Sequence, residues 1–400
     1  METKNRISWT LALVALVGAA LAALIFGSPL AHVGAASPPV RAVSFRPDVL
    51  ANSQSTEVIA SGLNNPRGLS FGPEGALYAA EAGSGGAGLC AEGPEGLRCY
   101  GTTGSITRID LRSGVVTRVA SGIPSLALAD GSFATGIQDI FFNGLGSGAF
   151  TMGWGGDPAD RAVQFGAAGA DFARLGRMNA FGNWSIGENL GDFEMAANPT
   201  GDEIDSNPYG ILALPGKRIV ADAGANDLLE VSPKGQVSVL AVFPNRDVEP
   251  SPILGFPPGT LISMDAVPTS VALGPDGNYY VGQLAGFPFP ANDSNVYRVP
   301  ASGGTADVYA GAFTAIIDVA FGPDGSMYVL EIAKNGLLDA FIFNDWTGAL
   351  IRVAPDGTRT EIAEGALFAP GGVAVDSDGT LYVTNNSIFT GSGQVLRIKP

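Results

Sequence analysis

Histidine is nearly absent from this sequence of 400 residues. The single histidine, His32, lies in the apolar N-terminal region, so a chain cut after that region would contain none. This scarcity excludes histidine general bases, the Ser-His-Asp and Cys-His pairs that activate a nucleophile, and zinc sites with histidine ligands. It favours a non-catalytic protein, and it leaves the enzyme question open.

Basic residues are also few. The chain has 22 Lys and Arg against 38 Asp and Glu, which gives a formal net charge of -16. Phosphates would be repelled and no basic stripe offsets this, so a nucleic-acid partner is excluded. The acidity is typical of a soluble protein, and it also leaves carboxylates available for divalent cations such as Ca²⁺.

Cysteine occurs only at Cys90 and Cys99, which enclose a loop rich in Gly and Glu. In an oxidising compartment this spacing predicts a structural disulfide. Two thiols without histidine make a poor metal site, and a redox-active pair is more often C-x-x-C.

The N-terminus has the pattern of an export signal. Lys4 and Arg6 precede an uncharged run at 9–26, and small residues follow it. We predict that residues 1–36 are a signal peptide or an uncleaved N-terminal anchor, and that 37–56 are a linker. The protein is then secreted or extracytoplasmic, and it meets a membrane only if residues 9–26 are retained.

Glycine and proline are abundant, with 56 and 27 residues, although 46% of the chain is hydrophobic. This combination is typical of short strands joined by tight turns. Four segments repeat one unit of strand, Gly-Pro-Asp-Gly-like turn and second strand ending near a tyrosine. They are Leu69–Tyr78, Val271–Tyr280, Val319–Tyr328 and Val373–Tyr382.

Two weaker copies, at 137–153 and 209–222, bring the number of units to six. Third and fourth strands follow each unit, but the last unit ends after its third strand at 394–398. Residues 56–62 carry the fourth-strand pattern at the other end of the chain. The sequence therefore predicts an all-β fold over 57–400, a six-bladed β-propeller closed by an N-terminal strand that completes the last blade.

The repeat unit is similar to that of NHL-type propellers, and a second set of segments resembles the ScyD/ScyE family. These segments are Gly104–Arg108, Gly153–Pro158, Asp205–Gly210, Ala221–Leu228, Tyr280–Pro290 and Tyr328–Ile332. The resemblance covers about residues 57–400. It implies an exported propeller and assigns no catalytic residues.

The connections between second and third strands are the long ones, at 82–103, 154–170, 284–294 and 332–347. Variable loops on a rigid scaffold are where binding usually occurs. We therefore expect the site on this long-loop face of the propeller, opposite the short Gly-Pro-Asp-Gly turns.

Aligning the repeats places polar residues in rings around that mouth. The ends of the second strands contribute Glu81, Gly153, Asp222, Gln283, Glu331 and Asn385. The starts of the first strands contribute Arg67, Gln138, Tyr209, Thr269, Ile317 and Gly371, and the next positions contribute Gly68, Asp139, Gly210, Ser270, Asp318 and Gly372. The predicted binding residues are Arg67, Glu81, Asp139, Tyr209, Asp222, Gln283, Asp318, Glu331 and Asn385. The alternative is that they cap strand ends and satisfy backbone groups. The repeated Tyr78, Tyr280, Tyr328 and Tyr382 are interpreted as packing between blades.

Two functions are carried forward from the sequence. The first is a monomeric binding or scaffold module of the cell envelope that holds a small polar ligand or an envelope protein. The second is a calcium-dependent hydrolase or lactonase resembling gluconolactonase-type propellers, with Glu81, Asp139, Asp318 and Glu331 as candidate metal ligands. A quinone-dependent sugar dehydrogenase is disfavoured because no histidine base remains.

Overall fold

The computed structural model describes residues 55–144 and 146–399. The predicted signal or anchor segment at 1–36 and most of the linker lie outside these residues. Within the described ranges, no helix has the length and apolar character needed to cross a membrane.

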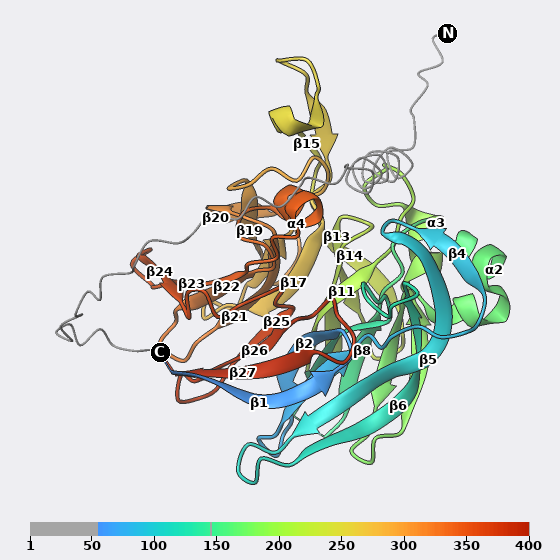
Figure 1. Ribbon diagram of the computed structural model, residues 1–400, viewed down its shortest axis with the longest axis vertical. Helices are drawn as coiled ribbons and strands as arrows, with labels where there is room; N and C mark the ends of the chain where they lie inside the picture. The colour runs from blue at the N-terminus through green and yellow to red at the C-terminus, as the bar shows by residue number, and fades with distance from the viewer. Residues whose placement is uncertain (1–54, 145, 400) are drawn as a thin grey trace, which may run out of the picture.

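The described residues form six sheets of four or more strands, which confirms the predicted six-bladed β-propeller (Figure 1). Blade 1 contains β2 (Pro66–Phe71), β3 (Leu77–Glu81), β5 (Gly96–Ile109) and β6 (Val116–Ala127), with the short β4 (Cys90–Gly93) paired to β5. Blade 2 contains β7 (Ile137–Phe142), β8 (Gly148–Met152), β9 (Arg174–Met178) and β10 (Trp184–Asn189). Blade 3 contains β11 (Pro208–Leu214), β12 (Lys217–Asp222), β13 (Asp227–Val231) and β14 (Val237–Val242).

The second half of the ring repeats this order of strands. Blade 4 contains β17 (Pro268–Leu273), β18 (Tyr279–Gln283), β19 (Ser294–Val299) and β20 (Asp307–Phe313). Blade 5 contains β21 (Ile316–Phe321), β22 (Met327–Glu331), β23 (Ala349–Val353) and β24 (Arg359–Ile362). Blade 6 contains β25 (Gly372–Val375), β26 (Leu381–Asn385), β27 (Gly393–Lys399) and β1 (Ser55–Leu63).

The inner strands contact one another in ring order, from β2 through β7, β11, β17, β21 and β25 back to β2. At the last blade, β1 pairs antiparallel with β27, with Thr56 opposite Ile398 and Leu63 opposite Gly393. Figure 1 shows this pair as a blue strand beside a red one. The two ends of the described chain therefore share one sheet.

Tyrosines of the repeat pack between blades, as predicted. Tyr78 lies 4.4 Å from Phe142 of blade 2, measured between ring centroids, and Tyr280 lies 4.9 Å from Phe321 of blade 5. Tyr382 of blade 6 meets Phe71 of blade 1 edge-on at 5.6 Å. Aromatic pairs of this geometry add about 0.5–1.5 kcal/mol beyond the burial of their area. The repeated tyrosine thus joins each of these blades to its neighbour.

The inner strands of the first five blades each carry a register irregularity near their start. In blade 5 it falls between Ile316 and Asp318, and in blade 2 between Ile137 and Ile140. A β-bulge bends the strand and re-aims the side chains that follow it. It therefore decides which residues of the inner strands face the axis.

The connections between second and third strands hold most of the irregular structure. They include α2 (Asp160–Phe165), η1 (Gly166–Asp171) and α4 (Leu337–Phe343). The predicted disulfide is confirmed, since Cys90 and Cys99 are bonded across the β4–β5 pair.

Two insertions between blades have no counterpart in the repeat. One carries α3 (Leu190–Ala197) between blades 2 and 3, and the other carries β15 (Arg246–Val248), η2 (Pro252–Leu254) and β16 (Ile262–Met264) between blades 3 and 4. The β15–β16 hairpin projects from the ring at the top of Figure 1.

Candidate functional site

The polar residues at the ends of the second strands turn back into their own blades. Each accepts a hydrogen bond from a backbone N–H near its blade's inner strand or third strand. In blades 1, 5 and 6 the donor lies 17 residues earlier: Asn64 donates to Glu81, Thr314 to Glu331 and Phe368 to Asn385. The strand-capping interpretation of this ring therefore holds for these side chains, because their oxygens bond to the scaffold.

Glu81 is the most heavily bonded member of this ring. Its carboxylate is 0% exposed and accepts from the Ser105 and Thr107 hydroxyls at 3.0 and 2.5 Å. Arg118, on the outer strand β6, donates from Nε at 3.1 Å and from Nη2 at 2.8 Å. With the Asn64 N–H at 2.8 Å, five donors surround the two oxygens. Glu81 therefore joins the start of the inner strand of blade 1 to its third and outer strands.

The side-chain oxygens of Asp222 and Gln283 also accept hydrogen bonds from the scaffold. Asp222 accepts from the N–H groups of Asn207, Gly224 and Ala225 and from the Ser206 hydroxyl. Gln283 Oε1 accepts from both the backbone and the side-chain amide of Asn295, its neighbour on β19. Neither side chain offers its oxygens to a ligand.

Glu331 occupies the position of Glu81 but lacks that residue's cation. It accepts from the Thr314 N–H at 2.8 Å, and burial raises the pKa of Glu331 to about 7. The same repeat position thus holds a paired carboxylate in blade 1 and a group that is half protonated near neutral pH in blade 5.

Four of the nine predicted binding residues do come together, near the axis of the ring. Burial raises the pKa of Tyr209, the charges of Asp318 and Asp139 raise it further, and the charge of Arg67 opposes them. Arg67 donates from Nη2 to the Ala134 carbonyl at 2.7 Å, while its buried Nε has no partner among the described residues. These four residues are called the axial polar group below.

Asp139 and Asp318 occupy the same place in blades 2 and 5, which are opposite each other in a ring of six. Asp139 accepts from its neighbour Ile140 N–H at 2.8 Å and from the Ile211 N–H of blade 3 at 2.9 Å. Asp318 accepts likewise from Val319 at 2.7 Å and from the Val373 N–H of blade 6 at 2.8 Å. Each carboxylate therefore ties its own inner strand to that of the next blade.

The two carboxylates also affect each other's protonation. Burial raises the pKa of Asp318 to about 7, with the two N–H donors opposing it. Burial raises the pKa of Asp139 well above its ordinary value, and the charge of Asp318 adds to the effect. Near neutral pH the pair therefore holds protons that free aspartates would have lost.

Aromatic side chains from distant blades meet on the long-loop face. Phe133, just before blade 2, lies 6.3 Å from Phe341 on α4 and 5.8 Å from Trp346, both in the blade 5 connection. Phe289, in the blade 4 connection, lies 6.3 Å from Phe341. Because Phe133 leads into blade 2, opposite blade 5, its two contacts link distant parts of the ring, whereas Phe289 and Phe341 come from neighbouring blades. We call these four residues the axial aromatic cluster.

The cluster shares one hydrophobic core with Tyr209 of the axial polar group. Phe133, Phe289, Phe341 and Tyr209 are all half-buried and pack on one core that includes Ile317, the neighbour of Asp318. Phe133 and Phe289 hold positive φ angles of 50° and 56°, a conformation that non-glycine residues rarely adopt. The mouth is thus apolar, which differs from the oxygen-rich mouth expected from the sequence.

The candidate metal ligands do not fit a common ion. Glu81 and Glu331 bond within their own blades, and Asp139 and Asp318 each accept two backbone N–H groups. Across residues 55–144 and 146–399, no three His, Cys, Asp or Glu side chains gather into a metal-binding group. The structure therefore does not gather the four predicted ligands into one group.

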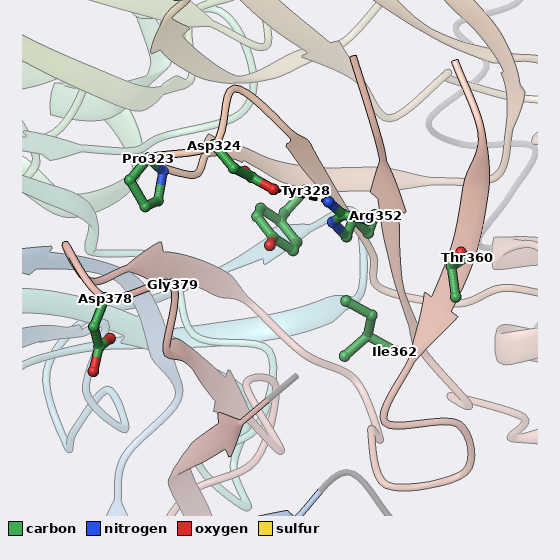
Figure 2. A pocket seen from close by; sticks show the side chains of 8 residues that line it. All are labelled: Pro323, Asp324, Tyr328, Arg352, Thr360, Ile362, Asp378 and Gly379. Carbon is green, nitrogen blue, oxygen red and sulfur yellow. Dashed lines mark hydrogen bonds and ion pairs between the residues drawn. The ribbon is translucent and has the colours of Figure 1, made fainter. Parts of the chain in front are cut away.

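Two surface cavities lie elsewhere, on the short-turn face. The larger, of about 390 Å³, lies between blades 5 and 6, and Figure 2 shows its labelled lining, in which Asp324 and Arg352 pair at 2.8 Å. Its charged residues repeat a pattern found in other blades, where Glu74 pairs with Arg108 and Asp276 with Arg298. The cavity is therefore a notch between blades built from repeat residues.

Comparison with known proteins supports the fold and does not identify a family. No protein-family profile matches the chain, and no curated protein does. A gluconolactonase from Xanthomonas campestris is similar in structure, with a TM-score of 0.50, 8% identity, and 86% of this chain and 89% of that chain covered. Virginiamycin B lyase from Staphylococcus aureus gives 0.47 and 14%, covering 87% and 100%. The calcium-binding protein regucalcin from Agrobacterium tumefaciens gives 0.47 and 15%, covering 86% and 95%. At such identities the likeness concerns the propeller fold alone.

Proposed function

We propose that this chain is an exported, ScyD/ScyE-like propeller that acts as a binding or scaffold module at the cell envelope. It holds its ligand or partner on the long-loop face, over the axis. The observation that carries the proposal is the axial aromatic cluster, in which the half-buried Phe133, Phe289 and Phe341 meet the buried Trp346 and share one core with Tyr209 of the axial polar group. Export rests on the pattern of residues 1–36 and is tested by locating the protein in fractionated cells.

The chemistry of this group favours an amphipathic ligand over a purely polar one. Half-buried phenylalanines offer rings for an aromatic or aliphatic body. In the axial polar group, the Nε of Arg67 is buried without an acceptor among the described residues. A buried donor without a partner costs about 1–3 kcal/mol, and an anionic group of the ligand would remove that cost.

A probe with an aromatic body and a single anionic group tests the proposal directly. The full-length chain is titrated with anilinonaphthalene sulfonate (ANS), and its fluorescence is followed. We expect saturable binding that the double variant Phe133→Ala/Phe341→Ala weakens by about tenfold or more, which corresponds to about 1.4 kcal/mol. The matched control is Phe181→Ala, because Phe181 is 89% exposed and lines the second cavity on the opposite face. Equal affinity in all three proteins would refute the site.

The alternative, a calcium-dependent lactonase, has less support. The candidate ligands are bonded to the scaffold, as described above, and residues 55–400 contain no histidine. Hydrolysis of simple lactones is measured with millimolar calcium and with chelator, in the wild type and in Asp139→Asn/Asp318→Asn. We expect no calcium-dependent rate in either protein. A calcium-dependent rate that disappears in the double variant would establish the hydrolase instead.

A further inference from the structure

Two carboxylates in the interior lack any hydrogen-bond partner within the part of the chain that the structure describes. Glu194, on α3, is 1% exposed, and Asp227, at the start of β13, is 0% exposed. All four of their carboxylate oxygens lack a hydrogen-bond donor among the described residues. A buried carboxylate in this state is costly, and proteins normally supply it with a cation, a metal or a proton.

The fold brings the two side chains to one end of blade 3. Asp227 lies directly opposite Asp222 in the β12–β13 ladder, so their β-carbons are neighbours on one face of the sheet. Glu194 follows Leu190 by one helical turn, and Leu190 packs on Val220 and Leu229 of the same two strands. Glu194 therefore shares the face of α3 that covers this hairpin.

Two further acids fix negative charge around the pair. The carboxylate of Asp222 accepts four hydrogen bonds, which hold it in place. Asp205 accepts from the Gly156 N–H at 2.6 Å, and its Oδ1 lies 2.4 Å from where a Gly224 β-carbon would be. It therefore touches the β12–β13 turn, and only glycine fits at position 224.

Among the described residues, no positive side chain acts on the pKa of Glu194 or Asp227. Burial raises the pKa of Asp227 well above its ordinary value, and the charges of Asp222 and Glu194 add to it. Burial likewise raises the pKa of Glu194 to about 7, with Asp222 and Asp205 adding to it. Elsewhere this chain gives a buried acid an arginine: Arg118 pairs with Glu81 and Arg218 with Glu188.

We propose that Glu194 and Asp227 bind a divalent cation, Ca²⁺, between α3 and the β12–β13 turn. Carboxylate oxygens are the ligands that hard cations take, and a charge of two balances both side chains. The proposed site has two carboxylate ligands, so it is consistent with the absence of any group of three acidic, histidine or cysteine ligands among the described residues. Backbone carbonyls and water would complete the coordination of the ion. The ion would fasten the insertion between blades 2 and 3 onto blade 3, and metal binding would couple to folding.

The test combines metal content with thermal unfolding of the full-length chain. Elemental analysis after purification without chelator is expected to find one calcium per chain. The thermal midpoint is expected to be higher in calcium than in chelator. Calcium is also expected to raise it more than the same concentration of magnesium does. In Glu194→Gln/Asp227→Asn both effects disappear, because the amides have the same shape without charge. Asp139→Asn/Asp318→Asn serves as the matched control and keeps both effects.

Several results would overturn the proposal. One is a wild type without calcium and without a calcium-dependent midpoint, which would leave a proton as the partner of these acids. Another is calcium retained in the Glu194→Gln/Asp227→Asn variant, which would show an adventitious ion. The single variant Glu194→Gln repeats the measurement if the double variant does not fold. Probe binding at the axis is independent of all these outcomes.

Discussion

Replacing Glu81 by glutamine should destabilise the propeller far more than the same change at Glu331. The two residues occupy one repeat position, yet their surroundings differ. Glu81 Oε2 accepts from the Asn64 N–H and from Arg118 Nη2, while Oε1 accepts from Arg118 Nε and two hydroxyls. In either orientation, the NH₂ of a glutamine would face an N–H donor of Asn64 or Arg118.

The expected magnitude follows from those contacts. Removing one partner of a buried ion pair typically costs 3–5 kcal/mol, and an unsatisfied buried donor costs about 1–3 kcal/mol. Arg118 is 44% exposed at its side chain, so water relieves part of its loss. We therefore expect Glu81→Gln to lose about 2–4 kcal/mol of unfolding free energy.

Glu331→Gln is the matched comparison. Glu331 accepts from the Thr314 N–H, a bond that the amide oxygen of glutamine can still accept, and burial raises the pKa of Glu331 to about 7. Loss of its charge is therefore nearly neutral, within about 1 kcal/mol. Equilibrium urea unfolding followed by tryptophan fluorescence measures both variants. Equal costs at the two positions, or a cost below about 1 kcal/mol at Glu81, would refute the structural role assigned to Glu81.

Three further outcomes are expected. Because the folded state raises the pKa of Asp318 to about 7, the contribution of this residue to stability is greatest below about pH 4 and is lost as the pH rises to about 7. The variant Asp318→Asn should therefore flatten this part of the curve of stability against pH, measured by urea unfolding. An unchanged slope would contradict the prediction. Replacing Cys90 and Cys99 by alanine removes a cross-strand disulfide and should cost at most about 2–3 kcal/mol in urea unfolding, whereas failure to fold would show a larger role. The variant Arg218→Met leaves the buried Glu188 paired only with the more exposed Arg177. Measured in low salt, it should lower the thermal midpoint more than the exposed control variant Arg112→Met does. Equal effects of the two variants would contradict the prediction.

Much of the fold could be predicted because each blade repeats the same short sequence pattern. A Gly-Pro-Asp-Gly turn has its own backbone preference, and the tyrosine that follows it, such as Tyr280, packs on the next blade. The insertions at α3 and at β15–β16 carry no repeat signal, so only the folded chain shows where they lie. The meeting of Glu194 with Asp227 depends on the first of these insertions, because Glu194 lies on α3.

The site was harder to predict than the fold. Aligned positions put Arg67, Tyr209, Asp139 and Asp318 around one mouth, and the structure brings these four near one another because inner strands share an axis. Alignment could not show that Glu81 turns back into its blade, since the Asn64 donor and Arg118 are 17 and 37 residues away. The bulges that re-aim the inner strands leave no mark in the sequence either.

The axial aromatic cluster left no repeated signal. Phe133, Phe289, Phe341 and Trp346 come from connections of different lengths, at unrelated repeat positions. Their sequence signal was limited to lying in or near the long connections that were expected to carry the site. Only the closure of the ring, which places blades 2 and 5 opposite each other, brings these rings together.

The binding proposal is tested most directly by a crystal structure of the full-length chain grown with ANS. The expected result is density for the probe on the long-loop face, with its rings against Phe133 and Phe341 and its sulfonate directed toward Arg67. Density only in the short-turn cavities, or an axis filled by its own side chains with no probe bound, would contradict the proposal.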